Sequence, residues 1–181
     1  MIIGFIGSGN MAEALVRGIL DARLAEPQDV VMSDVRPERL DEMHRRYGVR
    51  TEEDNAALAG AVDVIVLSVK PQTMTGVLEQ IAQAVRPETA VISIAAGIST
   101  ARIGRALPNV AVVRVMPNTP ALVGAGAAGL YCADPASGAM KTALRIFSAV
   151  GVAVAVDREE LIDAVTAVSG SGPAYFFLLM E

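Results

Sequence analysis

The sequence predicts an α/β fold built on a doubly wound, mostly parallel sheet. Short runs rich in valine and isoleucine alternate along the chain with segments long enough to form helices. These runs are continuously apolar, which is typical of parallel strands buried on both faces. The first run ends in a glycine-rich turn, and apolar residues at helical spacing follow it. Together these three observations indicate a Rossmann-type domain.

Each expected element follows from a local pattern. The expected strands cover residues 2–6, 30–32, 62–69, 90–94, 110–115, 127–132 and 152–156. The expected helices cover residues 11–19, 38–46, 72–85 and 135–149, with another after Ser99. Pro71 stops the third strand because proline has no N–H to donate. The Ser99 hydroxyl is placed to accept a hydrogen bond from a free amide in the first turn of the next helix.

The last part of the chain differs from the rest. Residues 1–156 form the predicted dinucleotide-binding domain, and residues 157–181 form a separate segment. In that segment, residues 161–168 have the pattern of an amphipathic helix, and the Ser/Gly/Pro residues 169–173 are expected to interrupt it. Residues 174–180 are almost wholly apolar, and a helix that is apolar on every side requires burial. We therefore expect this segment to pack on another copy or to continue into a longer protein.

Composition excludes several classes of protein. The 181 residues carry 15 basic and 20 acidic side chains and no basic stripe, so no nucleic-acid partner is expected. The single cysteine, Cys132, and single histidine, His44, exclude a disulfide framework and a multi-histidine zinc site, so no metal is expected. The apolar runs are strand-sized and the N-terminus has no charged leader, so neither a membrane span nor a signal peptide is expected. The predicted location is the cytoplasm.

The glycine-rich turn carries the first functional motif. Gly7, Gly9 and Ala12 fit the pattern G-x-G-x-x-G/A directly after a strand and at the start of a helix. Gly9 leaves room for a pyrophosphate to approach the backbone, and the free amides and dipole of the helix N-terminus attract its charge. The alternative is a glycine-rich turn without a ligand. The context within a βαβ unit favours the dinucleotide site.

Two residues near the end of the second strand give conflicting indications of the cofactor. Asp34 lies about 20 residues beyond the glycines, where a carboxylate binds the ribose hydroxyls of NAD. Arg36 is placed to pair with the 2′-phosphate of NADP. A solvated arginine before Pro37 is the other interpretation, so the choice of cofactor stays open.

Further polar or small residues follow the later strands. Ligands of parallel sheets bind at the carboxyl edge, where residues 68–71, 95–97 and 117–120 are expected. A strand-ending turn or ordinary packing explains the first two equally well. The hydroxyls and free amides of residues 169–173 suit a carboxylate, although a linker between helices is the alternative. The chain has no G-x-S-x-G, H-E-x-x-H or Walker A sequence, which disfavours hydrolases, metalloproteases and P-loop NTPases.

Five motifs in order resemble those of the pyrroline-5-carboxylate reductases. They are GFIGSGNMA (residues 4–12), SVKPQ (68–72), SIAAGI (93–98), VRVMPNTPALVGAG (113–126) and SGSGPAYFF (169–177). The resemblance implies an oxidoreductase of proline biosynthesis that uses NAD(P)H to reduce the cyclic imine 1-pyrroline-5-carboxylate to L-proline. The two later motifs are more specific than the glycine motif, which many dehydrogenases share.

The resemblance also implies roles for individual residues. Cofactor binding is expected at Ile6, Gly7, Ser8, Gly9, Asn10, Met11, Asp34, Arg36, Asn55, Ser68, Val69, Lys70, Pro71, Ile94, Ala95, Ala96 and Gly97. The substrate is expected near Asn118, Thr119, Ser169, Ser171 and Gly172. No residue of this chain is assigned a catalytic role, because the cofactor supplies the hydride and the protein supplies orientation and electrostatics.

Members of this family continue into an all-helical second domain that dimerises. Residues 174–181 are the expected first turns of that domain, so the start of a truncated helical domain follows the sheet. The full-length protein is expected to be a homo-oligomer that reduces the imine carboxylate, whereas this chain alone is expected to bind cofactor with little turnover. The alternatives are a non-catalytic dinucleotide-binding module or another small Rossmann reductase.

Overall fold

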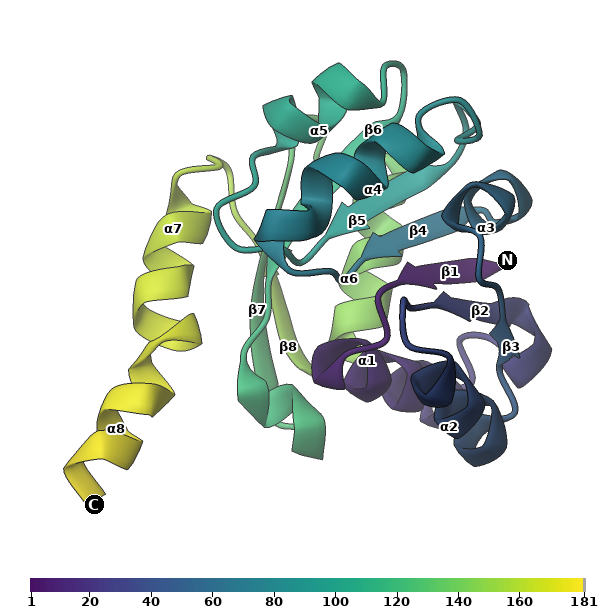
Figure 1. Cartoon of the computed structure of the whole chain (residues 1–181). Coiled ribbons are helices and arrows are strands. Elements are labelled where there is room, and N and C mark those ends of the chain that lie inside the picture. Colours follow the sequence, from purple (N-terminus) through teal and green to yellow (C-terminus); the bar gives the residue numbers. More distant parts are fainter. Residues whose placement is uncertain (181) are drawn as a thin grey trace.

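The computed structural model describes residues 1–180 and contains one eight-stranded sheet (Figure 1). The strands are β1 (Ile3–Ile6), β2 (Val30–Ser33), β3 (Arg50–Thr51), β4 (Val64–Leu67), β5 (Ala90–Ser93), β6 (Ala111–Met116), β7 (Gly126–Cys132) and β8 (Gly151–Ala155). The helices are α1 (Asn10–Asp21), α2 (Pro37–Tyr47), α3 (Asn55–Ala61), α4 (Met74–Ile81), α5 (Thr100–Ala106), α6 (Gly138–Ser148), α7 (Leu161–Val165) and α8 (Gly172–Met180).

The strand order β3-β2-β1-β4-β5-β6-β7-β8 confirms the doubly wound, mostly parallel sheet. Strands β1 to β6 run parallel, β7 runs antiparallel to β6, and β8 runs parallel to β7. The chain first winds outward from β1 to β2 and β3, and then crosses to β4 on the other side. This switch point, between the carboxyl ends of β1 and β4, is where open α/β sheets bind ligands.

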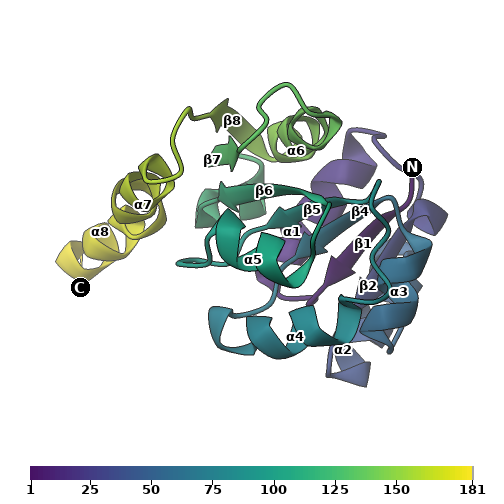
Figure 2. The ribbon, with the colours of Figure 1, turned by 90° about the horizontal axis from the view of Figure 1, so that it is seen from above.

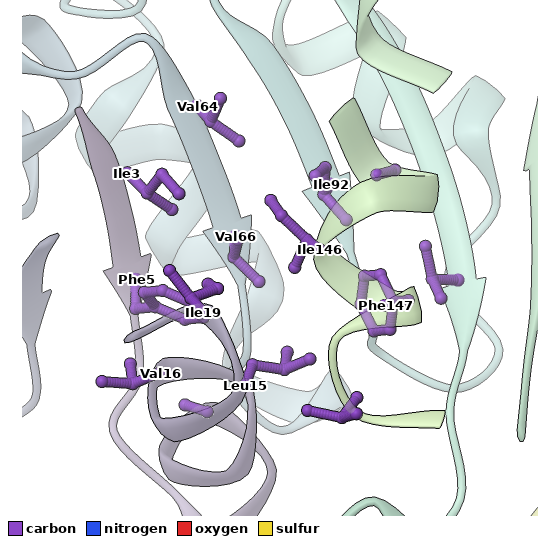
Figure 3. Packing of buried hydrophobic residues seen from close by; sticks show 14 of the residues in the cluster. Ile3, Phe5, Leu15, Val16, Ile19, Val64, Val66, Ile92, Ile146 and Phe147 are labelled. Atoms are coloured by element: carbon purple, nitrogen blue, oxygen red, sulfur yellow. The ribbon is translucent and has the colours of Figure 1, made fainter. Parts of the chain in front are cut away.

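Successive residues of the central strands pack on opposite faces of the sheet, as the two-residue period of a strand requires. Ile3 and Phe5 join one apolar cluster with residues of α1, α2 and α6 (Figure 3). Ile6 and Ile65 join a second cluster with residues of α3, α4 and α5. Helices therefore cover both faces (Figure 2), and the sheet is buried as its continuous apolar runs predict.

Two elements were not expected from the sequence. Strand β3 has two exposed residues and shows no apolar pattern. Helix α3 is short, and its N-terminus is capped by Asp54, whose carboxylate accepts a hydrogen bond from the Ala56 amide at 2.8 Å. The expected cap at Ser99 is confirmed, since its hydroxyl accepts from the Arg102 amide at 3.2 Å.

The helix breaks where the sequence predicts: α7 ends at Val165, and Ser171 is a bend after which α8 begins at Gly172. Thr166–Gly170 form a turn of π-helix between α7 and α8. Pro173 lies in the first turn of α8, where its missing N–H removes no helical hydrogen bond, so α8 can begin at this point.

The helical segments on the two sides of Ser171 also correct the expectation about membrane-sized helices. Taken together, Leu161–Met180 make 20 helical residues with a mean hydropathy of 1.2, enough to cross a membrane by length and composition alone. One such helix is weak evidence for a membrane protein, because a helix that packs against another protein chain meets the same criteria.

Helix α8 stands apart from the sheet in Figure 1. Its side chains from Tyr175 to Met180 are 60–82% exposed, so no other described residue covers this apolar segment. The preceding helix α7 is held to the sheet through the buried Arg114 on β6. The guanidinium of Arg114 pairs with Asp163 at 2.6 Å and Glu159 at 3.3 Å.

Candidate functional site

A cleft of about 700 Å³ lies at the switch point of the sheet. Loops from the carboxyl ends of β1, β2 and β4 form it, together with the amino end of α3 and the residues Val77 and Gln80 of α4. Its lining residues are Ile6, Gly7, Gly9, Ser33, Asp34, Val35, Arg36, Glu53, Asp54, Asn55, Ser68, Val69, Lys70, Thr73, Val77 and Gln80.

The two glycines of the loop serve different purposes. Gly7 has φ +95°, and a Cβ atom there would lie 2.8 Å from the carbonyl oxygen of Ser68. Gly9 has an ordinary φ of −70°, and a Cβ atom there would meet nothing within 4 Å. Gly7 is therefore required by the fold, whereas Gly9 leaves open space at the cleft and at the N-terminus of α1.

The N-terminus of α1 is free of side-chain caps. Gly9 is the N-cap residue and offers no side chain, and the first intrahelical hydrogen bond reaches the Gly9 carbonyl from the Glu13 amide at 3.0 Å. The amides of the first turn have no partner within the helix. Free amides beside a glycine and a helix dipole suit a phosphate group.

Ser8, between the glycines, is fully buried and hydrogen-bonded inward. Its amide donates to Asp34 Oδ2 at 2.8 Å, and its hydroxyl donates to the Ser33 carbonyl at 3.1 Å. Its carbonyl accepts from Arg39 Nε at 2.7 Å. These bonds connect the glycine loop to β2 and α2.

Asp34 and Arg36 are both in the cleft and form an ion pair. Arg36 Nε lies 3.0 Å from Asp34 Oδ1, and the arginine side chain is 54% exposed. Burial alone would raise the pKa of Asp34, but hydrogen bonds from the Arg36 guanidinium and the Ser8 amide outweigh it and hold that pKa below its ordinary value. Asp34 is thus an ionised carboxylate in the lining of the cleft.

Other polar side chains join the strands that form the cleft. The Ser68 hydroxyl, at the end of β4, lies 2.6 Å from the Gly7 carbonyl. The Asn55 side chain accepts from the Ser33 hydroxyl at 2.6 Å and donates to Gln80 Oε1 at 2.7 Å. Lys70 is exposed at the rim. Four of the predicted cofactor residues, Asn55, Ser68, Val69 and Lys70, therefore line this cleft.

Some predicted cofactor residues lie outside the lining of this cleft. Asn10 and Met11 occupy the first turn of α1, and Pro71 begins a short 3₁₀ helix. Ile94, Ala95, Ala96 and Gly97 form the turn after β5 at the same edge of the sheet, with Ala95 buried and Ala96 and Gly97 exposed.

Seven lining residues were not predicted from the sequence, namely Ser33, Val35, Glu53, Asp54, Thr73, Val77 and Gln80. Glu53 and Asp54 line the cleft because α3 begins at this edge, whereas Val77 and Gln80 line it from the middle and the carboxyl end of α4. Recognition of Asp54 as a helix cap was the signal that could have located the first of these helices.

A smaller hollow of about 370 Å³ lies between the loop after β6 and helix α8. It is lined by Asn118, Val168, Ser169, Gly172, Pro173, Phe176 and Phe177. Asn118 Nδ2 donates to Ser169 Oγ at 3.0 Å, and Asn118 Oδ1 accepts from the Ala127 amide at 2.8 Å. Asn118, Ser169 and Gly172 therefore come together as expected, whereas Thr119 and Ser171 are exposed and outside the lining.

The residue types at the cleft fit a dinucleotide and not a metal ion. Among residues 1–180, no three histidine, cysteine, aspartate or glutamate side chains lie close enough to hold a metal. The open space over Gly9, the uncapped helix and the carboxylate of Asp34 match the pyrophosphate and ribose of a nicotinamide dinucleotide.

Comparisons with known proteins identify the family. Residues 2–97 match the family described as NADP oxidoreductase coenzyme F420-dependent, and residues 159–181 match pyrroline-5-carboxylate reductase dimerisation. A pyrroline-5-carboxylate reductase from Pseudomonas aeruginosa is 47% identical over 99% of this chain and 66% of its own length. One solved from Coxiella burnetii is 38% identical, with a TM-score of 0.89, over 98% of this chain and 67% of that chain. The chain belongs to the pyrroline-5-carboxylate reductase family.

The resemblance found in the sequence is thereby confirmed. A pyrroline carboxylate reductase from Plasmodium falciparum, solved with NADP bound, is 29% identical with a TM-score of 0.86, over 99% of this chain and 66% of that chain. The nicotinamide dinucleotide assigned from the glycine motif agrees with the cofactor in that structure. The chain spans about two thirds of the length of the relatives it matches.

The different surroundings of the two glycines predict different costs of substitution. Gly7→Ala should lower the free energy of unfolding by about 2–3 kcal/mol, because alanine is strained at positive φ and its Cβ meets the Ser68 carbonyl. Gly9→Ala is the matched control and should stay within about 0.5 kcal/mol of wild type. Urea unfolding measures both. Equal losses for the two variants would contradict this account of the loop.

The lowered pKa of Asp34 predicts a pH-dependent contribution to stability. Since folding lowers this pKa, the ionised carboxylate stabilises the fold above the ordinary aspartate pKa of about 3.9, and the contribution is lost as the pH falls below it. The gap in urea midpoint between wild type and Asp34→Asn should be constant from pH 7 to pH 5 and should narrow near pH 3. A gap that is the same at all three values would show that the carboxylate charge contributes nothing.

Proposed function

We propose that this protein is an NAD(P)H-dependent reductase that converts 1-pyrroline-5-carboxylate to L-proline. The observation that carries the proposal is the glycine loop at the switch point, with an uncapped α1 behind it and open space over Gly9. Family membership supplies the substrate class, since the relatives are pyrroline-5-carboxylate reductases. This makes the protein an oxidoreductase of proline biosynthesis that acts on a carbon–nitrogen double bond.

The chain's residues would hold the cofactor in three places. The backbone of residues 6–11 would bind the pyrophosphate at the N-terminus of α1, and Asp34 and Arg36 would face the adenosine ribose. Residues 68–71 and 94–97 would border the path toward the nicotinamide at the same sheet edge, with Asn55 beside the first of these segments. When bound, the reduced cofactor supplies the hydride.

The hollow at Asn118 is the proposed substrate side of the site. Asn118 follows β6 and Ser169 lies in the π-helical turn after α7, so two segments far apart in the sequence meet there. Thr119, Ser171 and Gly172 belong to the same two segments. The lining contains hydroxyl, amide and apolar groups but no ionisable side chain. These groups would bind and orient an imine carboxylate, and the chain supplies no acid or base from this wall.

We assign residues 1–156 to cofactor binding and residues 157–181 to the family's dimerisation domain. The match of residues 159–181 to that domain supports the assignment. The exposed aromatic and aliphatic side chains of α8 would pack on a second copy of the protein. Turnover by the 181 residues alone should be low, because Phe176 and Phe177 on the substrate side are 70% and 60% exposed and do not exclude water. The proposed location is the cytoplasm.

The proposal is tested by calorimetric titration with NADPH and NADH, followed by an imine-reduction assay. Wild type should bind at least one cofactor, and Gly9→Val should lower that affinity at least 100-fold because its side chain fills the space over the loop. Gly104→Val is the matched control, since Gly104 on α5 also has nothing within 4 Å of its Cβ position. Unchanged affinity in Gly9→Val would remove the basis of the cofactor assignment.

Cofactor preference should respond oppositely to the two charged residues. Asp34→Ser removes the carboxylate that repels a 2′-phosphate and frees Arg36, so the ratio of NADPH to NADH affinity should rise about tenfold or more. Arg36→Ala should lower the same ratio. Competition titrations with both cofactors measure it. If the ratio of NADPH to NADH affinity changed in the same direction in both variants, Asp34 and Arg36 would not determine the preference for the 2′-phosphate.

A further inference from the structure

Arg39 is a buried charge outside the lining of the proposed cofactor cleft. It lies on α2 and is 9% exposed. Its guanidinium makes three hydrogen bonds: Nε to the Ser8 carbonyl at 2.7 Å, one terminal nitrogen to Glu42 at 2.7 Å, and the other to Glu13 at 2.5 Å. Two carboxylates therefore balance its charge, which is the condition under which an arginine is buried.

The bond to Ser8 fixes the orientation of one peptide unit. In a trans peptide the C=O and the following N–H point in opposite directions, and the chain contains no cis peptide among its described residues. Arg39 holds the Ser8 carbonyl on the protein side of the loop. The N–H of Gly9 consequently points away from Arg39, on the side where Gly9 lines the cleft.

Nothing else in the described structure holds that carbonyl. The amide and hydroxyl of Ser8 are bound by Asp34 and Ser33. These two bonds restrain the backbone nitrogen and the side chain of Ser8, but not the rotation of the peptide that joins Ser8 to Gly9. Gly9 has no side chain to restrict that rotation, and glycine has more freedom than any other residue. The arginine therefore restrains the loop at the position where the chain is intrinsically most mobile.

We propose that Arg39 is a positioning residue for dinucleotide binding, which aims the Gly9 amide at the cofactor pyrophosphate. The proposal rests on the proposed function for the identity of the ligand. Arg39 acts through the Ser8–Gly9 peptide and not through its own charge, because Glu13 and Glu42 neutralise it. Since α2 follows Asp34 and Arg36 directly, the same segment that faces the ribose also sets the loop that binds the phosphates.

The test separates the carbonyl bond from the ion pair. Arg39→Met alone would also remove one of the two arginines that pair with the half-buried Glu13, so Glu13→Gln is compared with the double variant Glu13→Gln plus Arg39→Met. Both have lost the Glu13 charge, and only the double variant has lost the bond to Ser8. Arg46→Met is a further control, because Arg46 also pairs with Glu13, at 2.6 Å, but is exposed and makes no hydrogen bond to the loop.

Two readouts are taken on each protein. The dissociation constant of NADPH or NADH should rise about tenfold from Glu13→Gln to the double variant, and Arg46→Met should stay within about twofold of wild type. Independently of any cofactor, amide hydrogens in residues 7–12 should exchange faster in the double variant than in Glu13→Gln. Equal affinities and equal exchange in these two variants would overturn the proposal.

Other results are equally informative. If the double variant does not fold, Arg39→Lys replaces it, since lysine keeps the charge but cannot extend the same three-way fork to Ser8, Glu13 and Glu42. Affinity and exchange equal to wild type in Arg39→Lys would overturn the proposal. If wild type binds neither cofactor, the proposed function fails, and the exchange rates alone decide whether Arg39 holds the loop.

Discussion

The inward hydrogen bonding of Ser8 is the constraint on which the cofactor side of this molecule depends. A glycine loop is useful to a ligand only if its amides point outward, and glycine provides no side chain to ensure that. Here the amide, hydroxyl and carbonyl of the buried Ser8 all form hydrogen bonds with residues in or next to β2 and on α2. The loop can then present Gly7 and Gly9 to the cleft while its centre remains part of the protein interior.

The same hydrogen bonds connect the loop to the ends of neighbouring strands. Asp34 binds the Ser8 amide with one oxygen and Arg36 with the other. Ser68 reaches the Gly7 carbonyl from the end of β4. The three strand ends at the switch point are thus held in register by contacts that are short in space and 25 to 62 residues apart in the sequence. We therefore expect a substitution at one strand end to shift the positions of the other two.

Features of the fold and of the cleft that leave a pattern in neighbouring residues could be predicted from the sequence, whereas features that depend on distant contacts could not. The apolar runs located seven of the eight strands, because burial on both faces leaves a continuous pattern; β3, with two exposed residues, leaves none. The glycine motif and Asp34 located the cleft, because their spacing is set by one βαβ unit. Arg39 was not found, since an arginine on a polar helix has the same appearance whether it is solvated or bonded to a distant carbonyl. The break before α8 was predicted because glycine and proline disfavour a helix interior, and Pro173 falls in the first turn of α8, where proline is accepted.

The reversed direction of β7 and β8 decides where the last helix goes. A chain leaving a strand parallel to β6 would emerge at the cofactor edge, and its next helix would run away from the site. Because β8 runs antiparallel to β6, the chain leaves the sheet at the opposite edge. The segment from Glu159 to Gly170 then runs back beside β6, where it meets Arg114 and Met116. This path brings Ser169 to Asn118. Because of this one change of strand polarity, the chain leaves the sheet and returns to the hollow at Asn118, so any surface that packs on α8 lies beside that hollow.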